Sequence, residues 1–416
     1  MFPEEFVTYT KELFGEERWQ RYLASFDEEA PVSVRTNPFK EIDIKEHFSS
    51  LAISMNEVPW CRGGYYLEKR PDFTLDPLLH AGAYYVQEAS SMFLDRVLQQ
   101  YLPQRTLRAL DLCAAPGGKS TLCRGALPEG SILMSNEPDR RRANILMENM
   151  QKQGHPEVIV TNNYPRDYRK AGIMFDVIIT DVPCSGEGMF RKDHGAIDEW
   201  SLQNVMKCAE LQRSIIADIW DNLVPGGLLI YSTCTFNTRE DEENVRWIME
   251  EYGAEILPVD IDSEWNITGS LLKGWEKPVY RFIPGITKGE GLFMAALRKP
   301  GNATSALCES SDISKALKKL RVLSDGHPVG EVKGKAIIPA HAEALLTNTP
   351  IDKYPRVELS HDAALSYLRH EALVLPADAP RGFVIVTYQS LPLGFVKNIG
   401  NRANNLYPQE WKIRNK

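Results

Sequence analysis

The chain has 416 residues, 43% apolar and 25% charged, which is enough for roughly two to four globular domains. Its net charge of −8 argues against indiscriminate nucleic-acid binding over the whole surface, although a local basic face is still allowed. No apolar stretch reaches the ~20 residues that cross a bilayer, and the seven cysteines form no C-x-x-C pair, so we expect a cytoplasmic protein with reduced thiols, no membrane span and no metal site.

Residues 1–75 are predicted to form a small α+β domain. The stretch PEEFVTYTKELFG carries apolar residues at helical spacing and stops at Gly15. The stretch APVSVRTNP alternates in the manner of a strand and ends at Pro38. A helix followed by a strand within so short a region favours a mixed domain.

Residues 76–300 alternate strand-like apolar runs with helical stretches. The runs are LRALDLCA, SILMSNEP, EVIVTNN, FDVIITDVP and GGLLIYST. Near-continuous apolar strands separated by helices predict a doubly wound, Rossmann-like α/β domain whose parallel sheet is covered on both faces. Ligands of such folds lie beyond the carboxyl ends of the strands. After the last run, Thr238 and Asp241 are spaced as a capping box for the next helix.

The loop DLCAAPGGKST, residues 111–121, follows the first of these runs. Gly117 and Gly118 allow backbone N–H groups to approach a ligand closely. A P-loop would need glycine where the chain has Cys113, and the dinucleotide fingerprint G-x-G-x-x-G is absent. The loop by itself is therefore compatible with a plain tight turn or with a nucleotide-type site of another kind.

The ends of the second and third strands favour an adenosyl ligand. Glu137 follows Gly117 by 20 residues, a spacing that suits hydrogen bonds to ribose hydroxyls. Without a phosphate-binding signature, S-adenosylmethionine is the natural candidate, although a capping or surface role for Glu137 is the alternative. Asn162 and Asn163 could bond an adenine edge, or could serve a turn before Pro165.

Two cysteines follow neighbouring strand runs. Asp181 and Cys184 lie in FDVIITDVPCSGEG, and Cys234 lies in YSTCTFN. Carbon 5 of a pyrimidine becomes nucleophilic only after a thiolate adds to carbon 6, so thiols beside a methyl-donor loop indicate cytosine-C5 methylation. Lys119 is the nearby cation that could favour a thiolate. For either cysteine alone, a buried inert thiol is the alternative.

The remaining chain is predicted to hold a linker and small connecting domain at 301–355 and a small β-rich domain at 356–416. The polar stretch KPGNATSALCESSDIS, residues 299–314, is typical of a linker. A basic cluster near the end could bind RNA phosphates or could be a solvated tail. Against the single acidic Glu410, it consists of Arg381, Lys397, Arg402, Lys412, Arg414 and Lys416.

Four ordered segments resemble the Nop/Sun family of RNA cytosine-5 methyltransferases. They are LDPLLHAGAYYVQEASSM (75–92), DLCAAPGGKS, DVPCSGEGMFRKD and YSTCTFNTREDEENV. The stretches SGEGMFRKD and LPLGFVKNIGNRANNLYPQEW (391–411) are similar to the bacterial RsmF-like branch, which methylates small-subunit ribosomal RNA and ends in a PUA-like RNA-binding domain. The resemblance implies RNA-binding domains at 1–75 and 356–416.

The resemblance also implies a role for each site residue. In this family the Thr-Cys segment supplies the nucleophile, so Cys234 would attack the base and Cys184 would assist product release. Asp181 would lie between cofactor and base, and Glu137 would hold the ribose. Asn162 or Asn163 would replace the acidic residue that the family often has in the third-strand segment. The methyl-donor pocket would be lined by Cys113, Ala114, Ala115, Pro116, Gly117, Gly118 and Lys119, the last also reaching the target cytosine.

The sequence thus predicts a monomeric, S-adenosylmethionine-dependent RNA cytosine-C5 methyltransferase, with 16S rRNA as the expected substrate. Four alternatives stay open: a tRNA cytosine-C5 methyltransferase, a P-loop-like NTPase, a non-catalytic RNA-binding protein of ribosome assembly, and a methyltransferase acting on an exocyclic amine. The last chemistry needs no thiol nucleophile.

Overall fold

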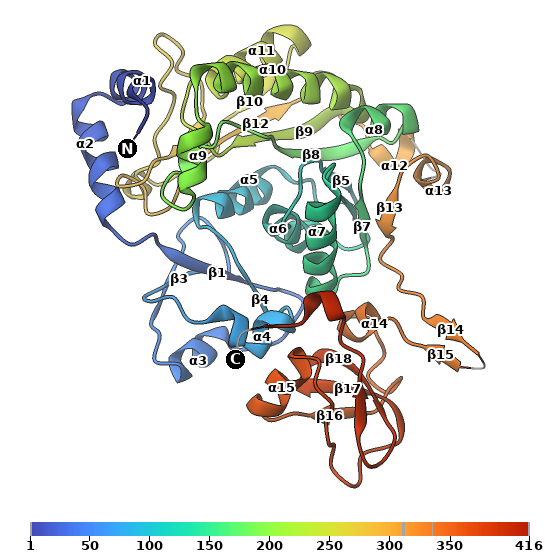
Figure 1. Cartoon of the computed structure of the whole chain (residues 1–416). Helices are drawn as coiled ribbons and strands as arrows, with labels where there is room; N and C mark the ends of the chain where they lie inside the picture. Colours follow the sequence, from blue (N-terminus) through green and yellow to red (C-terminus); the bar gives the residue numbers. More distant parts are fainter. Residues whose placement is uncertain (1, 310–312, 335, 415–416) are drawn as a thin grey trace.

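A computed structural model describes residues 2–309, 313–334 and 336–414 (Figure 1). The chain begins with two short helices and a 3-10 turn, which present an aromatic cluster to the central domain. Phe6, Trp19 and Tyr22 from these helices are buried together with Phe190 and Phe236. The first helix ends at a glycine with positive φ, as the sequence predicts. The elements are α1 (Glu4–Phe14), α2 (Glu16–Ala24) and η1 (Ser25–Asp27).

A four-stranded antiparallel sheet follows, in the order β2-β3-β1-β4. Its last strand lies beyond residue 75, within the range that the sequence analysis places in the central domain. Short helices cover the sheet, which stands beside the central domain in Figure 1. The elements are β1 (Val32–Thr36), α3 (Ile44–Ser50), β2 (Met55–Glu57), β3 (Gly64–Leu67), η2 (Phe73–Leu75), α4 (Pro77–His80) and β4 (Tyr84–Val86).

The central domain is built on a nine-stranded sheet, ordered β10-β12-β9-β8-β5-β6-β7-β13 with β11 paired to β12. Its five middle strands, β9-β8-β5-β6-β7, run parallel, and antiparallel strands close both sides. The strands are β5 (Arg108–Asp111), β6 (Ile132–Asn136), β7 (Val158–Thr161), β8 (Phe175–Asp181), β9 (Leu223–Thr233), β10 (Glu255–Leu257), β11 (Tyr280–Phe282), β12 (Leu292–Arg298) and β13 (Val322–Ser324).

Helices bury both faces of this sheet, because alternate strand residues point to opposite sides. Ala109 belongs to the apolar cluster shared with α5, α6 and α7, whereas Leu110 belongs to the cluster shared with α8, α10 and α11. The arrangement confirms the predicted doubly wound, Rossmann-like domain. The covering elements are η3 (Ser90–Met92), α5 (Phe93–Tyr101), α6 (Gly118–Ala126), α7 (Arg140–Gln153), α8 (Pro165–Ala171), η4 (Glu187–Met189), α9 (His194–Glu199), α10 (Leu202–Ile219), η5 (Trp220–Asn222), α11 (Glu242–Tyr252) and η6 (Ser263–Trp265).

The C-terminal part closes the sheet and then forms a separate unit. Strand β13 lies inside the range predicted as a linker and small connecting domain, yet it pairs with β7 of the central sheet. A four-stranded sheet, β16-β17-β18-β19, makes the β-rich end of the chain. The elements are α12 (Ala306–Glu309), α13 (Ile313–Leu317), β14 (Glu331–Lys333), β15 (Ala336–Ile338), α14 (His341–Leu345), β16 (Arg356–Glu358), α15 (His361–Leu368), β17 (Gly382–Tyr388), β18 (Leu391–Asn398), β19 (Ala403–Asn405) and η7 (Gln409–Trp411).

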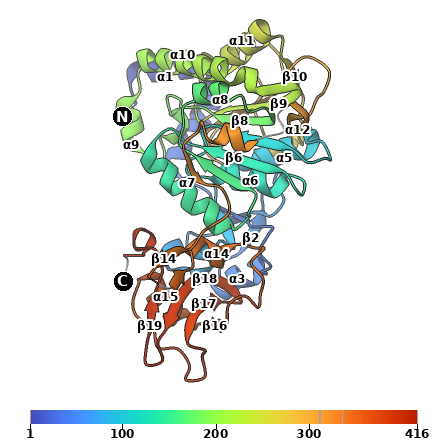
Figure 2. The ribbon, with the colours of Figure 1, turned by 90° about the vertical axis from the view of Figure 1, so that its right-hand side faces the viewer.

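This C-terminal sheet packs on the N-terminal sheet as well as on the central domain. Leu78 of α4 and Leu365 of α15 belong to one continuous apolar cluster. The two units lie side by side in both Figure 1 and Figure 2. Within the described ranges, no helix is both long and apolar enough to cross a membrane.

Candidate active site

The candidate site lies where the strand order reverses. The chain passes outward from β5 through β6 to β7 and then returns to place β8 on the other side of β5. In such sheets the loops at the carboxyl ends of the two central strands separate and leave a crevice. Asp111 ends β5 and Asp181 ends β8. The predicted site residues of both loops therefore meet at this crevice.

The loop after β5 is held by backbone and side-chain contacts from β6 and α7. Ala114 N donates to Asn136 O at 2.8 Å, and Arg142 donates from α7 to Ala115 O at 2.9 Å. Gly117 has a φ of 122°, in the region that favours glycine, and α6 begins at Gly118. The loop thus turns sharply into the positive end of α6. Around this turn the structure brings together Cys113, Ala114, Ala115, Pro116, Gly117, Gly118 and Lys119.

Glu137 lies directly after β6 and its side chain is buried. Its carboxylate accepts a hydrogen bond from Asp139 N at 3.0 Å, and Arg142 lies 3.5 Å from it. Asn162 approaches from the end of β7, where its amide donates to the carbonyl of Glu137 at 2.8 Å. Asn163 turns the other way, with its amide bonded to the backbone of Arg321 in both directions. Of the two asparagines, the structure brings only Asn162 beside Glu137.

Lys119 and Asp181 form an ion pair at the centre of the crevice. Their Nζ and Oδ2 atoms are 2.9 Å apart, and Ser232 donates to the other carboxylate oxygen at 2.7 Å. Burial alone would lower the pKa of Lys119, but the charges of Asp181, Asp111 and Cys234 raise it above its ordinary value. Lys119 is therefore a fixed cation that faces both a carboxylate and a thiol.

The two cysteines meet at the ends of β8 and β9. The Sγ atoms of Cys184 and Cys234 are 2.8 Å apart, and Cys234 N lies 3.2 Å from the sulfur of Cys184. The hydrogen bond to Cys234, together with burial, raises the pKa of Cys184 well above its ordinary value. Cys184 is therefore held as a thiol that can donate a hydrogen bond to the sulfur of Cys234.

Two buried glutamates join the cysteine loops, and the sequence pattern does not predict either of them. Glu240 accepts hydrogen bonds from Ser185 N at 3.0 Å and from Asn237 at 2.8 Å. Glu187 accepts from Phe236 N at 2.8 Å. Each carboxylate therefore bridges the loop after β8 and the loop after β9, which fixes the two sulfurs relative to each other. The only sequence signal is that both glutamates lie within six residues of a cysteine.

The predicted capping box after Cys234 is wrong. Asp241 precedes α11, but its side chain makes no capping hydrogen bond to that helix. Its carboxylate instead accepts a hydrogen bond from the Thr233 hydroxyl at 2.6 Å and forms an ion pair with Arg281 at 3.0 Å. Thr233 and Arg281 are both fully buried. Glu242 also pairs with Arg281, at 2.8 Å. The aspartate thus turns inward because a buried guanidinium offers a stronger partner than the helix N-terminus.

Asp111 is a further buried carboxylate beneath the cofactor loop. Ser120 donates to one of its oxygens at 2.7 Å, whereas the other oxygen has no partner among the described residues. Burial raises the pKa of Asp111 from its usual 3.8 to about 7. A carboxyl group whose folded-state pKa is raised stabilises the fold below its unfolded pKa, and this contribution is lost as the pH rises toward 7.

The variant Asp111→Asn should therefore flatten the dependence of stability on pH. Between pH 5 and pH 8 the wild-type free energy of unfolding should fall by about 3 kcal/mol more than that of the variant. Urea denaturation of both proteins without ligand, followed by circular dichroism, measures the difference. Parallel pH profiles would show that Asp111 does not titrate in this range.

Comparisons with known proteins agree with this geometry. The family model described as 16S rRNA methyltransferase RsmB/F matches residues 99–298. Models of the N-terminal domain and the PUA domain of 16S rRNA methyltransferase RsmF match residues 2–89 and 354–413. The ribosomal RNA small subunit methyltransferase F of Citrobacter koseri is 30% identical over 98% of this chain and 96% of its own length. Its counterpart in Enterobacter sp. is 28% identical over 98% and 95%.

Two solved structures from Pyrococcus horikoshii share the fold. A methyltransferase homolog has a TM-score of 0.61 and 25% identity, over 72% of this chain and 95% of its own. NSun6 with SFG has a TM-score of 0.61 and 22% identity, over 72% and 99%. In the ranges that the structure describes, no group of three or more potential metal ligands is assembled. The shared fold and the family matches place the crevice in a methyltransferase domain.

Proposed function

Because the chain belongs to the RsmF family of 16S rRNA methyltransferases, we propose that it methylates carbon 5 of a cytosine in 16S rRNA through a covalent adduct with Cys234. The observation that carries the proposal is the 2.8 Å separation of the Cys184 and Cys234 sulfurs at the reversal of strand order. Methylation of an exocyclic amine would need neither sulfur.

The cofactor is S-adenosylmethionine, which supplies an electrophilic methyl group. The residues present fit this ligand. Gly117 provides a turn without a side chain, and Glu137 provides a buried carboxylate for ribose hydroxyls. Asn162 is proposed to contact the adenosyl group, while the amide of Asn163 is already bonded to Arg321. The remaining proposed contacts come from the loop residues between Cys113 and Lys119.

In the proposed reaction Cys234 loses its thiol proton to water and adds to carbon 6 of the cytosine as a thiolate. Lys119, held by Asp181 at 2.9 Å, gives a proton to ring nitrogen 3 as the electrons of the carbon 5–carbon 6 double bond move into the ring. Carbon 5 then acquires the methyl group, whose bond to the donor's sulfur breaks and leaves the donor as an uncharged thioether, and carbon 5 loses its proton to water. The carbon–sulfur bond breaks, its electron pair returns to Cys234, and nitrogen 3 returns its proton to Lys119.

Cys184 is assigned to the release step. Its thiol lies close enough to donate a hydrogen bond to the sulfur of Cys234 as that sulfur regains its charge. A better stabilised leaving group breaks its bond faster. The buried bridges through Glu187 and Glu240 keep this geometry constant during the reaction.

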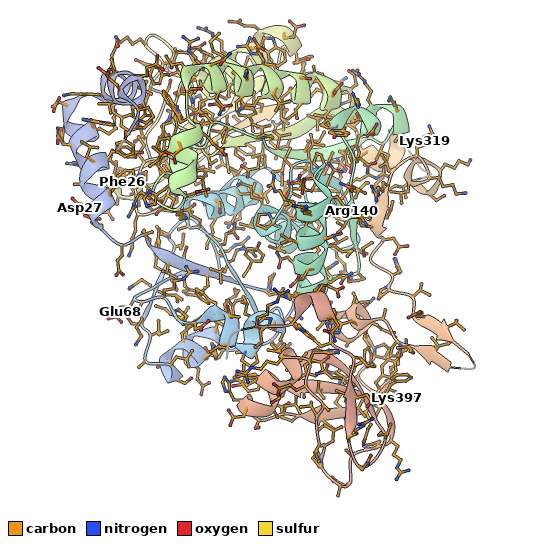
Figure 3. All side chains as sticks on the ribbon, in the orientation of Figure 1. Phe26, Asp27, Glu68, Arg140, Lys319 and Lys397 are labelled. Atoms are coloured by element: carbon orange, nitrogen blue, oxygen red, sulfur yellow. The ribbon has the colours of Figure 1, made fainter. Side chains whose placement is uncertain are left out.

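The flanking domains are proposed to select the RNA, because the crevice receives only one base splayed out of its stack. The proposed domains are residues 1–75, 76–300, 301–355 and 356–416, with β4 completing the N-terminal sheet from beyond the first boundary and β13 completing the central sheet from the third range. The protein is proposed to be a monomer that acts in the cytoplasm. The basic cluster of the C-terminal domain is exposed, and Lys397 lies at its outer side in Figure 3. Its members within the described residues are Arg381, Lys397, Arg402, Lys412 and Arg414, while Lys416 lies outside them.

Bisulfite sequencing of ribosomal RNA from cells with and without the gene tests the proposal, since 5-methylcytosine resists deamination. We expect at least one 16S rRNA cytosine to be protected only when the gene is present, and restored by wild-type protein but not by Cys234→Ala. If cells without the gene lost protection of a tRNA cytosine and not of a 16S rRNA cytosine, the result would favour a tRNA cytosine-C5 methyltransferase. Full complementation by Cys234→Ala would exclude the covalent mechanism.

A further inference from the structure

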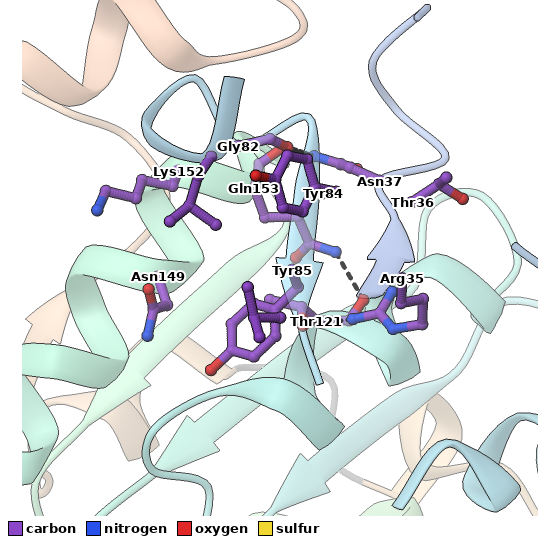
Figure 4. Close-up of a pocket in the computed structure, with 12 residues that line it drawn as sticks. Arg35, Thr36, Asn37, Gly82, Tyr84, Tyr85, Thr121, Asn149, Lys152 and Gln153 are labelled. Carbon is purple, nitrogen blue, oxygen red and sulfur yellow. Dashed lines mark hydrogen bonds between the residues drawn. The ribbon is translucent and has the colours of Figure 1, made fainter. Parts of the chain in front are cut away.

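A pocket of about 230 Å³ lies where the N-terminal sheet meets the central domain (Figure 4). Arg35 of β1 and Tyr85 of β4 line one side. Thr121 of α6, together with Asn149 and Gln153 of α7, lines the other. None of the proposed catalytic or methyl-donor residues lines it, so it is separate from the crevice.

The pocket nevertheless shares a wall with the methyl-donor loop. A Cβ placed on Gly118 would lie 3.4 Å from the ring of Tyr85, and Asn149 donates to Pro116 O at 2.8 Å. Tyr85 and Asn149 also line the pocket. A ligand in the pocket would therefore lie one side chain away from the loop that presents the methyl group.

The polar atoms of the pocket suit a ligand that carries N–H donors. Gln153 is only 4% exposed, and its amide nitrogen donates to Thr121 O at 2.6 Å. Its carbonyl oxygen has no partner among the described residues, which is costly for a buried acceptor unless a ligand supplies the donor. The amide nitrogen of Asn149 likewise donates to Pro116 O, so its amide oxygen is the group that can accept a hydrogen bond from a ligand.

The remaining groups suit a flat, electron-rich ring close to phosphate. Tyr85 is half-buried and offers an aromatic face on which a base can stack. Arg35 brings a positive charge, fixed by hydrogen bonds to Gln87 at 2.8 Å and to Thr121 at 2.7 Å. The volume lies below the ~300–1,000 Å³ of pockets for drug-sized ligands, which favours a small ligand such as a single base.

We propose that this pocket holds a second base of the RNA substrate, one with an exocyclic amino group, splayed out near the target cytosine. The inference rests on the proposed function, because it requires an RNA substrate at the crevice. Stacking on Tyr85 would hold the base, and the oxygens of Gln153 and Asn149 would accept from its amino group. Uracil offers only its ring N3–H to the two acceptor oxygens and would be disfavoured. The pocket would then add sequence selection that a crevice receiving one cytosine cannot provide.

Steady-state methylation of 30S subunits from cells lacking the gene tests the pocket. We expect Tyr85→Ala to raise the KM for subunits about tenfold, the loss typical of one stacked base, while kcat and the Kd for S-adenosylmethionine change less than about twofold. Tyr85→Phe keeps the ring and should behave as wild type. Tyr101→Ala, at the end of α5 and outside the pocket, is the matched control.

A uridine scan then identifies the base. Subunits are reconstituted with 16S transcripts in which each neighbour of the mapped cytosine is replaced by uridine. One replacement should raise the KM of wild type about tenfold and leave that of Tyr85→Ala unchanged. An unchanged KM for Tyr85→Ala would overturn the pocket proposal. A rise in the Kd for S-adenosylmethionine as large as the rise in KM would overturn it too. Failure of wild type to methylate the subunits would instead overturn the proposed function.

Discussion

Cys234→Ala is expected to lower methyl transfer more than about 1,000-fold and to leave no protein–RNA adduct, because the sulfur that attacks carbon 6 in the proposed reaction is removed. Cys184 lies next to position 234, but burial still raises the pKa of its thiol in this variant and favours the protonated form, which is a poor nucleophile. The measurement is incorporation of tritiated methyl groups into 30S subunits, with a denaturing gel to detect RNA-linked protein.

Cys184→Ala is expected to give the opposite pattern on the same gel. The variant can still form the bond through Cys234, but it has lost the thiol that stabilises the departing sulfur, so a slowly migrating adduct should accumulate. Ribonuclease should remove the shift. Cys61→Ala, a buried cysteine of the apolar core, should show neither effect. An adduct in Cys234→Ala and none in Cys184→Ala would reverse the two roles.

The arrangement of these residues could be predicted because each lies at or just beyond the end of a buried strand. Asp181 is the last residue of β8, Cys184 lies in the loop after it, and Cys234 directly follows β9. Parallel strands bring their carboxyl ends to one edge, so the apolar pattern alone places such residues near one another. The same pattern could not give the 2.8 Å contact of the sulfurs, which depends on how the two loops turn.

The supporting contacts could not be predicted, because their partners are distant in sequence. Asp241 has a local capping pattern, yet it pairs with Arg281, which lies 40 residues later. The position of Asn163 predicts a cofactor contact, yet its amide binds the backbone of Arg321 beside β13. That short strand lies in a segment whose composition is typical of a linker. In each case a long-range partner outweighs a local preference, and a single sequence carries no periodic signal for that partner.

Arg281→Met is expected to give the largest loss of stability among the non-catalytic residues. The guanidinium is fully buried, with Asp241 at 3.0 Å and Glu242 at 2.8 Å. Removing one partner of a buried ion pair leaves an uncompensated charge and costs about 3–5 kcal/mol. At pH 8 the melting temperature should therefore fall by roughly 5–15 °C. Because Thr233, next to Cys234, is bonded to Asp241, methyl transfer at a permissive temperature should fall too.

The loss of stability caused by Arg281→Met should depend on pH in a defined direction. Burial alone would raise the pKa of Glu242, but the charge and hydrogen bonds of Arg281 hold it below its ordinary value. A lowered pKa stabilises the fold above the unfolded value of about 4.5, and this contribution disappears as the pH falls through the folded pKa. Burial already raises the pKa of Asp241 in the wild type, where Arg281 opposes the shift. Without Arg281 the pKa values of both carboxyl groups should rise and both should take up protons more readily, so the difference in stability from wild type should narrow from pH 8 to pH 5. Adding Asp241→Asn and Glu242→Gln to Arg281→Met removes the buried charges, so the triple variant should recover most of the stability lost at pH 8. If Arg281→Met alone lost the same stability at pH 5 as at pH 8, the contribution of Arg281 would come from packing and not from charge.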